Sequence, residues 1–151
     1  MLTRLPRRRP VETLLVLPFG KPPLNLNDRL HPHAKARKVA AVREATRWTA
    51  KVARLPRDLP HVWIEFVYRA PDRRTRDADN LVATLKPVAD ALAGGDSRKA
   101  GYGLVPDDSP RYMTKLMPVI LSPDDPRLPA LPKGASGVIV SWEDTTERTD
   151  R

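Results

Sequence analysis

The chain has 151 residues, which suits one domain with a hydrophobic core, and no stretch is apolar enough to span a membrane. Its 27 lysines and arginines exceed its 18 aspartates and glutamates, so the net charge is +9 and the isoelectric point is about 10.3, which favours nucleic acid as a partner. It has no cysteine, which excludes disulfides and thiolate metal sites and fits a reducing, cytoplasmic compartment.

The first half of the chain predicts a basic arm, a strand, a proline-rich loop and a long helix. Residues 1–10 include three consecutive arginines and are expected to be a flexible arm. Residues 11–17 are rich in apolar residues and predict a strand. The loop that follows offers Asn25 and Asn27, whose side chains could shape the loop or bind phosphate. Apolar residues then recur every three or four positions over residues 34–55, which indicates a helix.

This helix is predicted to have two different faces. Its apolar residues are expected to pack against the core, and they are Ala41, Ala45, Trp48, Val52 and Leu55. A row of cations lies roughly 125° away around the helix. It consists of Arg43, Arg47, Lys51 and Arg54. Such a row is often an ordinary solvated face, but the scarcity of acids near it favours a row that faces phosphate.

The second half of the chain predicts four elements separated by loops. These are a strand over residues 61–68, a helix over 79–93 and strands over 111–121 and 137–142. Leu81, Leu85, Val88 and Leu92 share one face of the helix, and Pro87 is expected to kink or break it.

The order of strand, helix, strand, helix, strand, strand predicts an α+β fold. We expect a small mixed sheet with two main helices packed on one face, in a single domain over residues 11–143. Trp48, Trp63 and Trp142 are expected in the core, and the polar tail, residues 144–151, is expected to be disordered.

The segment after the second strand carries the residues with the clearest chemistry. Asp77 and Asp79 point the same way in an extended segment, and their hard oxygens suit Mg²⁺. Asp107 or Asp108 could supply a third carboxylate. Alone, these acids are more typical of a helix cap and a turn. The same loop, however, is crowded with cations, namely Arg73, Arg74 and Arg76. Cations beside carboxylates favour a site where a phosphodiester is held for metal-assisted hydrolysis.

Three segments together resemble the RusA family of Holliday junction resolvases. They are PDRRTRDADNL at residues 71–81, Asp90-Ala91-Leu92, and LVPDD at residues 104–108. PPLNLNDR at residues 22–29 also resembles the family's early loop. The resemblance implies a RusA-like fold and a homodimeric endonuclease that uses Mg²⁺ or Mn²⁺ to cut four-way DNA junctions in recombination and repair.

By motif position, the resemblance implies that the essential, metal-binding acids are Asp77, Asp79 and Asp108, with Asp107 adjacent. The family has a functional lysine four residues after the second aspartate, where this chain has Ala83. Counting back from Asp90 points instead to Lys86, about 10 Å further along the helix than Asp79. The residues expected to contact DNA are Arg73, Arg74, Arg76, Asn80, Arg43, Arg47, Lys51, Arg54, Asn25 and Asn27.

Two other interpretations stay open at this point. The displaced lysine fits a DNA-binding protein of the same fold that has lost catalysis. A structural or interaction protein would use its aspartates only as caps and turns, and would lose about 1 kcal/mol of stability when a cap is removed.

Overall fold

The computed structural model describes residues 10–94 and 100–144. Nearly all of the predicted basic arm and polar tail lie outside these ranges, so those two predictions are not tested. The elements, in chain order, are β1 (Pro10–Val16), α1 (Pro32–Val52), β2 (Val62–Arg69), the 3-10 turn η1 (Ala78–Leu81), α2 (Val82–Leu92), β3 (Met113–Lys115), β4 (Val119–Leu121) and β5 (Ser136–Glu143).

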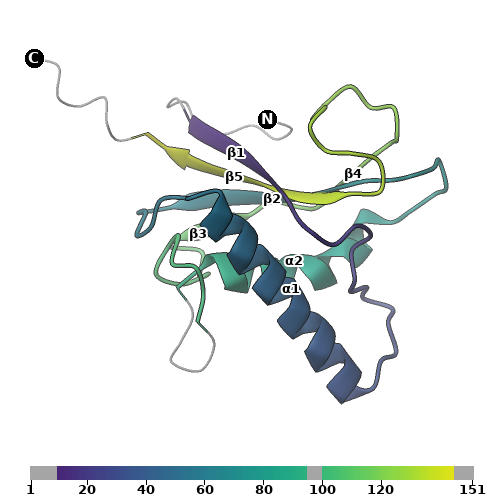
Figure 1. The fold of residues 1–151 in the computed structure, drawn as a ribbon, viewed down its shortest axis with the longest axis horizontal. Helices are drawn as coiled ribbons and strands as arrows, with labels where there is room; N and C mark the ends of the chain where they lie inside the picture. Colours follow the sequence, from purple (N-terminus) through teal and green to yellow (C-terminus); the bar gives the residue numbers. More distant parts are fainter. Residues whose placement is uncertain (1–9, 95–99, 145–151) are drawn as a thin grey trace, which may run out of the picture.

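The strands form one mixed sheet, as predicted, and both helices cover the same face of it (Figure 1). Strand order is β1-β5-β2-β3. β4 also pairs with β2, but further along that strand than β3 does. β5 is antiparallel to both β1 and β2, whereas β3 and β4 run parallel to β2. The single strand expected over residues 111–121 is therefore two short strands. Pro118 lies between them and has no backbone N–H to donate to a ladder.

Alternate residues of β2 and one face of α2 make the centre of the core. Val62, Ile64, Phe66 and Tyr68 point from β2 toward the helices and are buried. The face predicted for the second helix is confirmed, because Leu81, Leu85, Val88 and Leu92 are all buried. The break expected at Pro87 does not occur, and α2 runs on to Leu92. Pro87 removes one hydrogen bond, near the start of α2, and its ring is buried.

The packing face predicted for α1 is wrong apart from Leu55, which is buried beyond the end of the helix. The buried residues of α1 are Val42, Thr46 and Ala50. Thr46 can occupy the core because its hydroxyl donates to the Val42 carbonyl at 2.8 Å. Trp48 is consequently 60% exposed rather than buried. The other two tryptophans, at positions 63 and 142, are half-buried.

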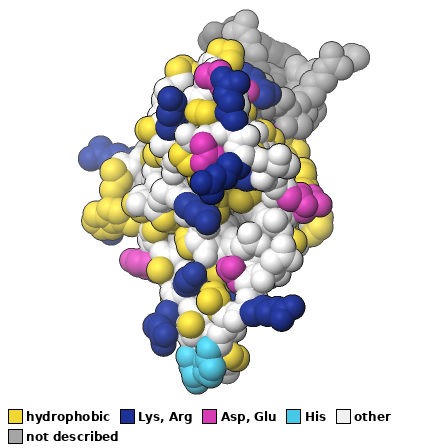
Figure 2. All heavy atoms as spheres, turned by 90° about the vertical axis from the view of Figure 1, so that its right-hand side faces the viewer, with side chains coloured by type: hydrophobic (Ala, Val, Ile, Leu, Met, Phe, Trp, Pro, Cys, Tyr) yellow, Lys and Arg dark blue, Asp and Glu magenta, His cyan; other side chains and the backbone are white. Residues whose placement is uncertain are grey.

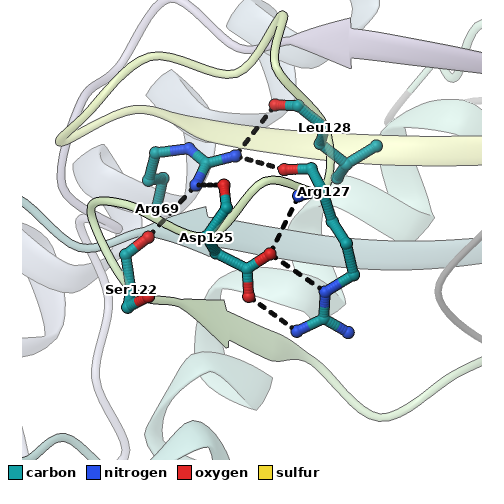
Figure 3. A network of polar contacts seen from close by, with 5 residues as sticks. All are labelled: Arg69, Ser122, Asp125, Arg127 and Leu128. Atoms are coloured by element: carbon teal, nitrogen blue, oxygen red, sulfur yellow. Dashed lines mark hydrogen bonds and ion pairs between the residues drawn. The ribbon is translucent and has the colours of Figure 1, made fainter.

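A buried arginine at the end of β2 organises the long connection between β4 and β5. The Arg69 guanidinium donates to five backbone carbonyls of residues 122–131, among them Leu131 at 2.6 Å and Asp125 at 2.8 Å. Figure 3 shows its contacts with Ser122, Asp125, Arg127 and Leu128. Within that connection Arg127 binds both carboxylate oxygens of Asp125, at 3.1 Å and 2.8 Å. These bonds, with the backbone N–H of Arg127, lower the pKa of Asp125 to about 2. Among the described residues no helix is long and apolar enough to span a membrane.

Candidate active site and nucleic-acid surface

Asp77 and Asp79 lie where the chain enters η1. Asp77 has an extended backbone and caps η1, since its Oδ1 accepts from the Asp79 N–H at 3.0 Å. Both side chains are exposed. Among the described residues, neither Asp77 Oδ2 nor the Asp79 carboxylate has a hydrogen-bond or ion-pair partner. One carboxylate thus acts as a cap, and three oxygens remain available to a ligand.

Asp77 lines a surface hollow of about 740 Å³. The polar side chains of Asn25 and Arg76 and the buried side chains of Tyr68 and Leu81 also line it. It lies between the end of β2, the start of η1 and the loop before α1, so it collects residues from distant parts of the sequence.

The loop before α1 is fastened to this site by one buried threonine. Thr84 Oγ1 in α2 accepts from the Leu24 N–H at 3.2 Å and donates to the Leu24 carbonyl at 2.9 Å. Asn25 Oδ1 then accepts from the Asn27 N–H at 2.9 Å, and Asn27 Nδ2 donates to Asn80 Oδ1 at 3.4 Å. The structure therefore brings together the three asparagines that the sequence singled out.

The arginines of the loop after β2 form ion pairs with nearby aspartates. Arg76 binds Asp72 at 2.8 Å, and this bond, followed by the Arg74 backbone N–H, lowers the pKa of Asp72. Arg74 also approaches Asp72, at 3.6 Å, and Arg73 binds Asp124. The side chains of Arg73 and Arg74 remain 76% and 83% exposed. These two can exchange a surface ion pair for a phosphate, since exposed pairs contribute little stability.

The contacts of Asp108 are with residues other than Asp77 and Asp79. It accepts from Lys115 Nζ at 2.8 Å and hydrogen-bonds Asp90 on α2. Asp79 and Asp90 are eleven residues apart, or about 16 Å along the helix axis. Accordingly, within residues 10–94 and 100–144 no three acidic or histidine side chains are grouped to hold a metal ion.

The pair of Asp90 and Asp108 is a second cluster that the sequence did not predict. Burial, and then the hydrogen bond to Asp108, raise the pKa of Asp90, whereas Lys115 lowers the pKa of Asp108. Of these two neighbouring carboxyls, Asp90 is therefore the weaker acid. The DAL motif contains Asp90 but gives no sign of this contact, and Lys115 reaches it only through the pairing of β3 with β2.

Lys86 belongs to this second cluster rather than to Asp79. Its Nζ lies 4.0 Å from Asp90, and its side chain is 74% exposed. The proposed replacement for the family lysine therefore lies in the middle of α2 and pairs with Asp90. Asp107 is exposed and accepts from the Ser109 N–H at 2.8 Å as part of a turn.

The row of cations predicted on α1 does not act as one surface. Arg43 turns inward to Asp90 at 3.6 Å, with a side chain only 13% exposed. Arg47 binds Glu44 at 3.2 Å, Lys51 lies over the Trp48 ring at 5.9 Å, and Arg54 follows the helix with φ 53°. The side of the molecule that bears the turn after β2 and the loop before α1 shows Lys and Arg side chains along its length, with fewer acids among them (Figure 2).

In comparisons with known proteins, no family model and no curated protein sequence matched this chain. The resemblance to the RusA family stays a prediction from the motifs at residues 22–29, 71–81 and 104–108.

Proposed function

We propose that the protein is a Mg²⁺-dependent endonuclease that cuts four-way or other branched DNA during recombination and repair, in the cytoplasm. The observation that carries the proposal is the pair Asp77 and Asp79 at the start of η1. Among the described residues, three of their carboxylate oxygens have no partner, and Asp77 lines a hollow together with Arg76 and Asn25, in a protein of net charge +9.

The donors fit the proposed metal. Exposed carboxylates are the oxygen ligands that Mg²⁺ or Mn²⁺ prefers, and their exposure leaves room for water and phosphate. A cation held by Asp77 and Asp79 would supply Lewis-acid activation of water and neutralise charge on the phosphate. The protein itself would orient the DNA. Arg73 and Arg74 are exposed enough to bind phosphates, while Asn80 steadies the loop before α1.

The third acid would come from a second copy of the chain. Asp108 hydrogen-bonds Asp90, which follows Asp79 by eleven residues, or about 16 Å along the helix axis, so the contacts of Asp108 set it apart from Asp79 within one chain. A two-fold dimer that sets Asp77 and Asp79 of one chain against Asp108 of the other would complete two equivalent sites. Two such sites match a reaction that nicks two opposed strands of a junction.

The first test is cleavage of a synthetic four-way junction with Mg²⁺. Wild type is expected to cut it, and Asp79→Asn is expected to lose about 100-fold or more in rate, because a metal ligand is removed. Asp58→Asn is a matched control, since Asp58 is exposed and its φ of 57° is one that asparagine adopts readily. Equal cleavage by wild type and Asp79→Asn would show that the carboxylate mechanism is wrong.

The second candidate function is binding of branched DNA without cleavage. It is favoured by the position of Lys86 beside Asp90, because no described lysine forms an ion pair with Asp79. Junction binding by wild type without cleavage in either Mg²⁺ or Mn²⁺ would favour this alternative.

A further inference from the structure

Trp48 is a large aromatic side chain on the outer face of α1. At 100° per residue it lies about 160° from the buried stripe of Val42, Thr46 and Ala50. It is 60% exposed, and Val52, one turn further on, is 64% exposed. Single exposed apolar residues are common, but an exposed indole offers a partner both a flat apolar face and an N–H donor.

The surroundings of the ring determine which partner it suits. Lys51 Nζ lies 5.9 Å from the ring centroid, and neither Lys51 nor Arg54 makes an ion pair with any described residue. Glu44, the acid one turn before Trp48, is engaged with Arg47 at 3.2 Å. A second copy of this face would bring cations against cations, which opposes self-association. A polyanion with flat apolar groups meets both the ring and the charges.

We infer that Trp48 stacks on an unpaired base of single-stranded or branched nucleic acid, while Lys51 and Arg54 hold the neighbouring phosphates. This inference rests on the proposed function for the nature of the partner, but it does not depend on the carboxylates. Bases in a duplex already stack on one another, so an aromatic platform selects bases that are unpaired. It does so with little sequence preference, because every base offers a π face.

The test compares nucleic acids that differ only in unpaired bases, in EDTA so that no cleavage occurs. The probes are an oligothymidylate, a four-way junction and a plain duplex, each titrated while tryptophan fluorescence and fluorescence anisotropy are recorded. Trp48→Ala is expected to weaken binding of the oligothymidylate on the order of 10-fold or more, with a change under about twofold for the duplex. Trp48→Phe should retain most of the affinity. Met117→Ala, which removes an apolar side chain that is 52% exposed elsewhere, should change nothing.

Three results would overturn the inference. They are unchanged oligothymidylate binding by Trp48→Ala, an equal loss on duplex and single strand, or conversion of a dimer to a monomer in sedimentation. An unchanged melting temperature would exclude misfolding of the variant. The outcomes also separate the two proposals. If wild type cleaves junctions and Trp48→Ala binds as wild type does, only this inference is contradicted. If binding depends on Trp48 but no junction is cleaved, only the proposed endonuclease function is contradicted.

Discussion

Two inactive variants are expected to restore activity when they share a dimer. In Asp79→Asn the first half of each site is damaged, and in Asp108→Asn the second half. If each site combines Asp79 of one chain with Asp108 of the other, a mixed dimer has one site with both substitutions and one intact site. Random assortment of equal amounts makes half of the dimers mixed. The mixture should therefore nick junctions at about one quarter of the wild-type rate.

The expectation follows from the separation of about 16 Å along the helix axis between Asp79 in η1 and Asp90 in α2, the hydrogen-bond partner of Asp108. The assay mixes the two variants under conditions that exchange subunits and measures nicking of an end-labelled four-way junction with Mg²⁺. A mixture of Asp77→Asn with Asp79→Asn is the matched control. Both substitutions damage the same half of the site, so every dimer stays inactive. No recovery in the first mixture, with exchange verified, would refute a site shared between chains.

Two further predictions concern the structure around the site. Thr84→Val keeps the side-chain shape but removes both hydrogen bonds to the Leu24 backbone. The free energy of unfolding, measured in urea, should therefore fall by about 2–4 kcal/mol. An unchanged free energy of unfolding would mean that Thr84 does not hold the loop in place. Asp125 has a pKa of about 2 when folded and 3.8 as its ordinary value, so its stabilising contribution is present above pH 3.8 and disappears as pH falls through about 2. Its NMR titration midpoint should rise toward 3.8 in Arg127→Met, and a midpoint that stays near 2 would assign the low pKa to another cause.

The sequence predicts the buried face of a helix well where the helix has only one apolar stripe. In α2 a single apolar stripe from Leu81 to Leu92 exists, and that stripe is buried. In α1 two stripes compete, and the larger side chain of Trp48 favours the wrong one. Which stripe is buried depends on Thr46. Its hydroxyl donates a hydrogen bond to a carbonyl of its own helix, so the side chain can be buried in the core. Periodicity alone does not reveal such a bond.

The candidate site is predicted only in its local part. Asp77 and Asp79 are two residues apart, so their shared position at the start of η1 follows from the sequence. The place of Asp108 depends instead on long-range contacts, with Lys115 of β3, which runs parallel to β2, and with Asp90 of α2. The order of two motifs along the sequence does not show whether their side chains meet in the fold.

The contacts of Arg69 have a consequence for how the connection between β4 and β5 can change. Its guanidinium holds residues 122–131 through carbonyl oxygens of the main chain, which every amino acid provides. The shape of this connection therefore does not depend on most of its side chains. Substitutions within it can alter the charge beside Arg73, which binds Asp124, and still leave the path of the chain intact. One residue of β2 thereby gives the protein a surface that can vary in composition while it keeps its form.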